Sequence, residues 1–137
     1  MELHHLDGRD QVSLEDVLEL NVADDKASVS FSYNGTCVTS SWDHIGEWHW
    51  KSGSGWVNSS RGGSATRICS YAETDTYSHF YNDPFCDLIF DEPMPRTWGR
   101  FYMVRVRGQE NGTQTNAHNI AKSGGCANAL HWDFESS

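Results

Sequence analysis

The sequence is poor in basic side chains and has no long apolar run. Only 10 of its 137 residues are Lys or Arg, against 19 Asp or Glu, and the formal net charge is -9. Such a chain repels polyphosphate and anionic membrane surfaces, which disfavours general nucleic-acid binding. The longest apolar stretches, such as residues 101–104, are far too short to cross a bilayer. We therefore expect neither a membrane span nor a general nucleic-acid-binding protein.

The chain also lacks the short motifs by which many enzymes are recognised. It contains no G-x-S-x-G elbow, no H-E-x-x-H pair, no Walker loop and no dinucleotide fingerprint. Its cysteines form no C-x-x-C pair, which argues against a zinc ribbon or a redox motif. We therefore expect no metal and no cofactor, and catalysis is not the favoured prediction.

Four cysteines are present, and their even number and wide spacing fit two disulfides: Cys37, Cys69, Cys86 and Cys126. Three pairings are possible. Cys69 and Cys86 are expected on strands with one other strand between them, so a bridge there closes a moderate loop and stabilises by about 3 kcal/mol. We favour that bridge, which leaves Cys37 with Cys126.

Disulfides, glycosylation acceptors and scarce lysine together predict an extracellular protein. Acceptor triplets begin at Asn34, Asn58 and Asn111, each in a turn-like setting rich in Gly or Ser. The first residues, Met-Glu-Leu-His-His, have neither the basic start nor the apolar middle of a signal peptide. The expectation is a mature secreted glycoprotein whose signal has been removed.

Length and periodicity predict one disulfide-stabilised β-rich domain over residues 1–137. The clearest strand covers residues 28–33, where three apolar side chains alternate with serines before an Asn-Gly turn. Other short strands are expected at residues 37–39, 66–71, 77–81, 86–90, 100–107 and 129–134. Six or seven short strands with little helix predict an antiparallel β-sandwich or a small β-barrel.

Two short helices and one long loop complete the predicted architecture. Residues 13–20 begin with a Ser-x-x-Asp capping box and predict a short helix, although a strand entering the sheet also fits their alternation. Residues 115–122 have weak helical character. Residues 52–64 are rich in Gly and Ser and predict a loop.

Four of the six tryptophans fall between residues 41 and 63. Trp42, Trp48 and Trp50 share one face if residues 42–50 form a regular strand, and such a face is ordinarily core. Trp56 differs from them because it lies in the predicted loop, with no periodic neighbours to bury it.

A tryptophan in a polar loop suits the C–H face of a sugar ring or a pocket on a partner protein, or it folds back onto the end of the core. The predicted contact surface is centred on Trp56 and helped by Trp50, Asn58 and Arg61. Its expected ligand is a host protein or a glycan, as for a small toxin, effector or lectin.

The rival prediction is a small secreted hydrolase of the ribonuclease kind, whose sheet carries a general acid, a general base and a phosphate clamp. Its candidate catalytic residues are His49, Glu47, Arg105, Arg107 and His131. The two arginines lie on one strand face and can hold one anion. Pairing with an acidic residue of a neighbouring strand, Asp87 or Glu73, explains them as well.

Asp43, Glu47 and His49 share a face of a regular strand, as a metal site or an acid/base pair requires. A polar outer face on a tryptophan-lined strand explains the same residues better. A third interpretation is a structural or inhibitor domain in which the tryptophans are core.

Overall fold

The computed structural model describes residues 4–15, 21–50, 56–83 and 96–136, and these residues are almost entirely β-strand. The strands are β1 (His4–Glu15), β2 (Asn21–Tyr33), β3 (Val38–Trp50), β4 (Trp56–Arg67), β5 (Tyr71–Asn82), β6 (Thr97–Gln109), β7 (Gln114–Gly124) and β8 (His131–Ser136). One 3-10 turn, η1 (Ala127–Ala129), precedes β8. The prediction of a mainly β chain is confirmed.

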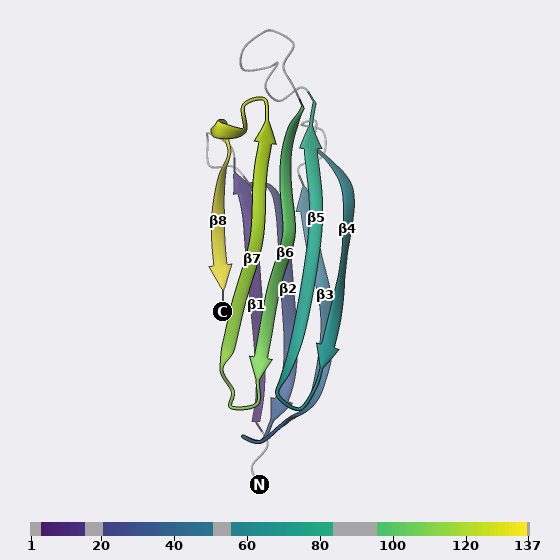
Figure 1. Cartoon of the computed structure of the whole chain (residues 1–137), viewed down its shortest axis with the longest axis vertical. Helices are drawn as coiled ribbons and strands as arrows, with labels where there is room; N and C mark the ends of the chain where they lie inside the picture. The colour runs from purple at the N-terminus through teal and green to yellow at the C-terminus, as the bar shows by residue number, and fades with distance from the viewer. Residues whose placement is uncertain (1–3, 16–20, 51–55, 84–95, 137) are drawn as a thin grey trace.

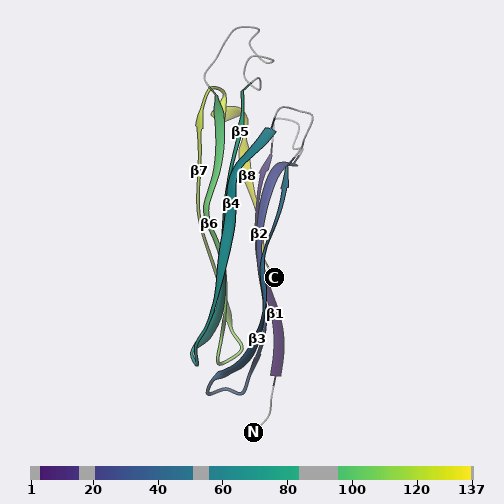
Figure 2. The same cartoon turned by 90° about the vertical axis from the view of Figure 1, so that its right-hand side faces the viewer.

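The strands form two four-stranded sheets (Figure 1). Sheet A has the order β3-β2-β1-β8 and sheet B the order β4-β5-β6-β7, and the pairings within both are antiparallel. Seen from the side, the sheets are two layers that face each other along their length (Figure 2). Each sheet therefore has an inner face against the other layer and an outer face.

Strand alternation explains why these layers form. Along β5 and β6 nearly every second side chain is buried, as expected where one face of a sheet is covered. The covered side chains form one apolar core between the layers, and its largest fully buried members are Phe31, Phe80 and Phe101. Gly99 and Gly108 of β6 leave room for Leu14 and Phe31 of sheet A, because a Cβ at either glycine would collide with those side chains.

Both helix predictions are wrong for the residues described. β1 continues to Glu15 because it pairs with β2 on one side and β8 on the other, and residues 16–20 lie outside the described structure. Residues 115–122 belong to β7, whose backbone is paired with β6 throughout. In both places the sheet ladder outweighs a weak local helical preference.

The predicted loop over residues 52–64 is also wrong from Trp56 onward, where β4 begins. β4 is an edge strand, and its Gly and Ser residues pair with β5 mainly through the backbone, with one further hydrogen bond from Ser59 Oγ to His79 O at 3.2 Å. Most of its side chains are exposed, so the strand gains little from apolar burial. A composition typical of loops is therefore compatible with a strand at the edge of a sheet.

The disulfide pairing differs from the predicted one. Cys37 is bonded to Cys69, with their Cα atoms 4.4 Å apart, so the predicted pairs Cys69–Cys86 and Cys37–Cys126 are both wrong. The turn after β2 and the turn after β4 lie at the same end of the molecule, where Val38 N donates to Cys69 O at 2.7 Å. Cys126 is also in a disulfide, and its partner lies outside the described residues.

Candidate functional site

The outer face of sheet B carries two parallel rows of aromatic and charged side chains. One row comes from β5 and consists of Tyr71, Glu73, Asp75, Tyr77, His79 and Tyr81; the other comes from β6 and consists of Trp98, Arg100, Tyr102, Arg105 and Arg107. Both strands are central in the sheet, so the two rows run side by side along its middle (Figure 1).

A β-bulge interrupts the two rows halfway along. The register between β5 and β6 shifts at Tyr77, which lies opposite both Tyr102 and Met103. The extra residue changes the phase of β6, so Tyr102 and Arg105 lie on the same outer face although they are three positions apart. Strict alternation would place Tyr102 on the face of Val104, but Val104 is fully buried whereas Tyr102 is 45% exposed.

An open pocket of about 400 Å³ lies beside this bulge. The exposed rings of Tyr77 and Tyr102 border it, and Tyr77 is 42% exposed. Its polar groups come from Ser64, Asp75 and Arg105. The pocket therefore combines aromatic surface with a hydroxyl, a carboxylate and a guanidinium.

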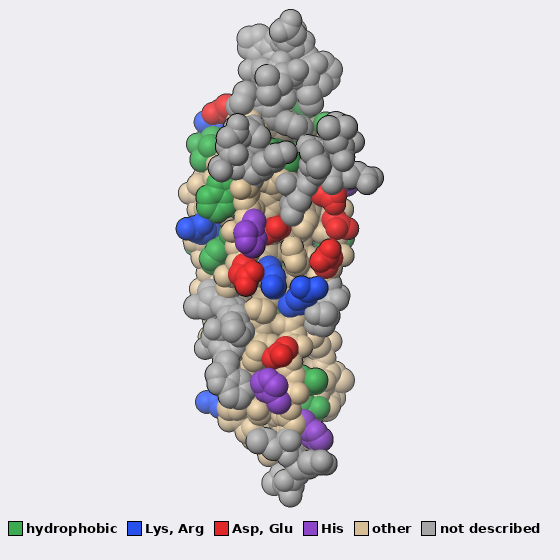
Figure 3. All heavy atoms as spheres, turned by 180° about the vertical axis from the view of Figure 1, so that it is seen from behind, with side chains coloured by type: hydrophobic (Ala, Val, Ile, Leu, Met, Phe, Trp, Pro, Cys, Tyr) green, Lys and Arg blue, Asp and Glu red, His purple; other side chains and the backbone are tan. Residues whose placement is uncertain are grey.

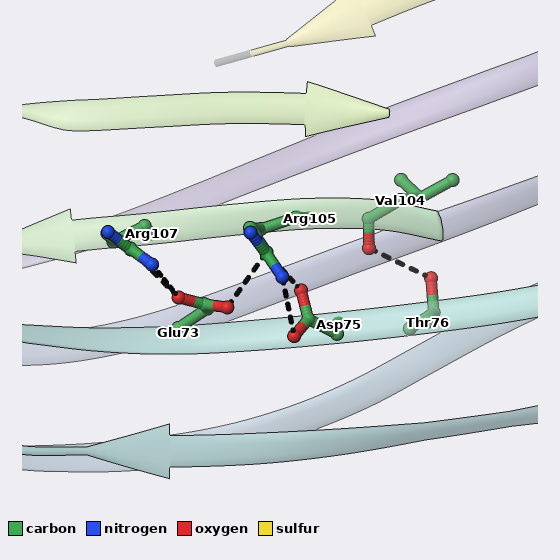
Figure 4. A network of polar contacts seen from close by, with 6 residues as sticks. All are labelled: Glu73, Asp75, Thr76, Val104, Arg105 and Arg107. Carbon is green, nitrogen blue, oxygen red and sulfur yellow. Dashed lines mark hydrogen bonds and ion pairs between the residues drawn. The ribbon is translucent and has the colours of Figure 1, made fainter. Parts of the chain in front are cut away.

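The charged groups of the pocket belong to an ion-pair network (Figure 4). Arg105 Nε lies 2.6 Å from Asp75 Oδ1 and 2.8 Å from Glu73 Oε1, and Arg107 Nε donates to Glu73 Oε2 at 2.8 Å. The hydrogen bond to Asp75 is the main reason that the pKa of Arg105 is raised. Pairing with Glu73, which the sequence allows, is thus present. Both arginines are held by carboxylates of β5 and are not a vacant clamp for a phosphate.

His79 extends the aromatic surface away from the pocket. Its ring meets those of Tyr77 and Tyr102 edge to face, with centroids 6.5 Å and 5.3 Å away. Burial, and then the charge of Arg100, lower the pKa of His79. The imidazole is therefore mainly neutral at pH 7 and continues the surface made by the two tyrosines.

A buried carboxylate lies behind the bulge, in the core between the sheets. Asp25 of β2 accepts hydrogen bonds from Thr76 Oγ1 at 2.5 Å and Ser78 Oγ at 2.9 Å, the residues on either side of Tyr77. Burial raises the pKa of Asp25 to about 6, although those hydroxyls and the Trp48 indole oppose the shift. Asp25 thus joins sheet A to the strand that carries one wall of the pocket.

The surface predicted around Trp56 is not formed. Trp56 is the first residue of β4 and only 4% exposed, so its ring belongs to the core and the prediction of an exposed loop tryptophan is wrong. Trp50 also packs against the core. Arg61 lies over Trp50, 5.3 Å from the ring centroid, and the amide of Asn58 donates to two backbone carbonyls. The other tryptophan of this face that is described, Trp48, packs against the core as expected.

The predicted catalytic residues are divided between opposite sides of the molecule. His49, Glu47 and His131 lie on the outer face of sheet A, seen in Figure 3, whereas the two arginines lie on the outer face of sheet B. On sheet A, two strands separate β3 from β8, so the axes of these strands lie about 14 Å apart, and His49 and His131 are also offset along the strands. The five residues do not form one site.

Each of the three sheet A residues has its own acidic or basic neighbour. His49 Nδ1 lies 2.9 Å from Asp24 Oδ1, and Lys26 Nζ lies 3.5 Å from Glu47. His131 Nε2 lies 3.8 Å from Glu15. The register of β3 shifts between residues 44 and 47, which breaks the alternation that grouped Asp43 with Glu47 and His49; the side chain of Asp43 is outside the described part.

The sequence does contain a signal for the β5 row, in the order of its residues rather than in their composition. From Tyr71 to Tyr81 the odd positions are aromatic, acidic or histidine, and the even positions are small or apolar. That alternation predicts an outer row over the whole strand. The partnership of this row with Tyr102 depends on the bulge, for which the sequence has no comparable signal.

Comparison with known proteins finds no relative. No protein-family model matches the chain, and no curated protein and no solved structure is significantly similar to it. Within the described ranges, no helix is long and apolar enough to cross a membrane. No group of three or more His, Cys, Asp or Glu among the residues with assigned positions could hold a metal ion.

Proposed function

We propose that this chain is a carbohydrate-binding β-sandwich whose ligand occupies the outer face of sheet B between Tyr77 and Tyr102. The observation that carries the proposal is the pocket of about 400 Å³ bordered by these two exposed rings. The C–H face of a sugar packs on an aromatic ring, while its hydroxyls need nearby donors and acceptors. Ser64, Asp75 and Arg105 supply such groups at the same pocket.

The dimensions of the site favour a sugar over a protein partner. A pocket of this volume is at the small end of the range for compact ligands, and it holds one or two sugar rings. A stable protein interface instead covers about 800 Å² on each partner and is centred on a desolvated hot spot. The ion pairs of Asp75 and Arg105 hold their polar atoms in place before a ligand arrives, which lowers the entropic cost of binding.

An extracellular location fits this proposal. The Cys37–Cys69 disulfide is of the kind that persists in oxidising compartments, where complex glycans are displayed. We therefore propose a secreted lectin-like protein, with the Asn-x-Thr triplets at Asn34 and Asn111 as candidate glycosylation acceptors.

A glycan array followed by calorimetry with the selected oligosaccharide tests the proposed function. We expect Tyr77→Ala and Tyr102→Ala each to weaken binding about tenfold or more, because each removes one stacking surface, and tenfold corresponds to about 1.4 kcal/mol. Tyr71→Ala is the matched control: Tyr71 belongs to the same row but packs against Arg107, 4.0 Å from the ring centroid, outside the pocket. Equal affinities for all four proteins would contradict the proposal.

A further inference from the structure

The charges of the chain are divided unevenly between the two sheets. The strands of sheet A carry nine acidic and two basic residues, whereas those of sheet B carry two acidic and six basic ones. A chain with a formal net charge of -9 therefore concentrates its positive charge on one of its two layers. That layer presents the proposed sugar site, and its field favours an anionic ligand over a cationic one.

Most arginines of the β6 row are neutralised by neighbouring carboxylates. Arg105 and Arg107 pair with residues of β5, and Arg96, just before β6, has its Nε 2.6 Å from Asp83 Oδ1. Arg100 differs from them: no carboxylate in the described part of the chain pairs with it. Its polar contact is with Ser123, whose Oγ lies 3.4 Å from a guanidinium nitrogen.

The guanidinium of Arg100 lies over one aromatic side chain, Trp98, at the edge of the proposed site. Its guanidinium carbon lies 4.3 Å from the centroid of the Trp98 ring, and a planar guanidinium stacked in this way loses less freedom when it binds an anion. Arg100 precedes Tyr102 by two positions on the same face, a separation of about 7 Å along the strand. The spacing is that of the two Cα atoms, and the guanidinium of Arg100 lies toward Trp98, so a sugar stacked on Tyr102 reaches it through an exocyclic charged group.

The opposite strand supplies no competing negative charge at this point. His79 is the residue of β5 paired with Arg100, and the positive charge of Arg100 contributes to the lowered pKa of His79. An anion placed there meets a guanidinium and a neutral imidazole, with the Tyr102 ring beside them.

We propose that the ligand is an acidic glycan whose sugar ring stacks on Tyr77 and Tyr102 while its negatively charged group binds the guanidinium of Arg100. This inference rests on the proposed carbohydrate-binding function and adds the chemical class of the ligand. Arg100 is the specificity-determining residue, because it is the arginine of the row whose charge no described carboxylate balances.

Matched pairs of sugars test the charge of the ligand. Sialyllactose and lactose form one pair, tri-galacturonate and its methyl ester a second, and a 6-sulfated galactoside and its unsulfated parent a third. We expect the wild-type protein to bind the charged member of at least one pair tenfold or more tightly at low salt, with the advantage shrinking as ionic strength rises. A preference for the carboxylated sugars identifies a carboxylate ligand, and a preference for the sulfated galactoside identifies a sulfate ligand.

Substitution then tests the assignment to Arg100. Arg100→Gln is expected to lower affinity for the charged sugar about tenfold or more and to leave affinity for its neutral partner unchanged. Arg100→Lys keeps the charge but loses the planar fork, so it should recover only part of the affinity. Arg96→Gln is the control, since it removes the same charge from an arginine that also lies over an aromatic ring and is already paired with Asp83.

The possible results separate the two proposals. Equal binding of charged and neutral sugars, sensitive to Tyr77→Ala but not to Arg100→Gln, overturns the acidic-ligand inference and leaves carbohydrate binding intact. Equal losses from Arg96→Gln and Arg100→Gln also overturn it, because they indicate a general effect of net charge. Failure of the folded protein to bind any glycan, charged or neutral, overturns both.

Discussion

On the outer face of sheet A, polar side chains form separate pairs across neighbouring strands, such as His49 with Asp24 and Lys26 with Glu47. Figure 3 shows this face, with histidines and charged side chains of both signs scattered over it. On the outer face of sheet B, charges are joined into a network and aromatic rings alternate with them. Both faces belong to antiparallel sheets of the same kind. The difference between the two surfaces therefore comes from their side chains and from the bulge at Tyr102.

The contrast shows where a β-sheet acquires a site. A regular ladder presents evenly spaced side chains on a nearly continuous surface. A register shift alone does not create a site, because sheet A contains one too, in β3. In sheet B the shift falls between two central strands and beneath two tyrosines, and a pocket lies beside it. We infer that a bulge contributes to a pocket when it lies beside exposed aromatic side chains, and that the presence of a bulge alone is not enough.

The largest effect is expected at Asp25, which links the two layers. The folded protein keeps this carboxyl protonated up to about pH 6, whereas an unfolded chain releases the proton near pH 4, so the folded state binds more protons in between. The protonated carboxyl therefore makes its full contribution to the free energy of unfolding below pH 4. This contribution falls by about 3 kcal/mol as the pH rises from 4 through 6.

Asp25→Asn removes that loss. Urea unfolding from pH 4 to 8 should show the stability of the variant relative to wild type rising with pH across this window and levelling off above pH 7. Asp24→Asn provides the comparison, because Asp24 is bonded to His49 rather than held between the sheets. A constant difference between Asp25→Asn and wild type at every pH would contradict the buried-carboxyl account.

A smaller effect distinguishes the ion pairs of the two faces. Glu73 is buried and bonded to two arginines, so Glu73→Gln is expected to cost about 2 kcal/mol of unfolding free energy at pH 7. Glu47 is exposed and pairs with one lysine at 3.5 Å, so Glu47→Gln should change stability by less than about 0.5 kcal/mol. Thermal unfolding of both variants measures the difference, and equal costs would remove the distinction between network and isolated pair.

Glycosylation of the Asn acceptors is expected to change the stability of the protein least. The amide nitrogen of Asn58, where a glycan would attach, donates to the carbonyls of Ser60 and His79 within sheet B. Asn111 lies exposed in the turn after β6, and its side-chain oxygen, not its nitrogen, makes the hydrogen bonds with Thr113. After expression through a eukaryotic secretory pathway, mass spectrometry should find a glycan on Asn111 and none on Asn58. The reverse occupancy would contradict this ranking.

The sequence predicts those parts of the fold that depend on local alternation. Residues 28–33 fall within β2, because their apolar side chains recur at every second position, and residues 100–107 fall within β6, where the alternation holds on either side of the bulge. β4 escapes such prediction, since Gly and Ser at an edge strand satisfy the backbone without any apolar signature. For residues 13–15 the sequence leaves two predictions open, a helix from the capping box and a strand from the alternation, and pairing with the two strands that flank β1 decides for the strand.

The candidate site depends on long-range placement and is predicted less well. The extra residue at the β6 bulge decides which side chains share a face with Tyr102, and a shift of one residue exchanges a buried side chain for an exposed one. Trp56 shows the converse: its polar neighbours in the sequence say little about a core formed by distant strands. The Cys37–Cys69 bond likewise follows from two turns that meet at one end of the molecule.

That bond also has a mechanical meaning. The chain between Cys37 and Cys69 contains all of β3 and β4, one edge strand from each layer, and a covalent bond closes it into a loop. When the two ends of the protein are pulled apart in a single-molecule experiment, the 32 residue-to-residue steps of this loop are not extended while the bond is intact. At about 3.5 Å per extended residue, reduction of the bond should release about 110 Å of hidden length. Until then, one long edge of each layer is shielded from the applied force.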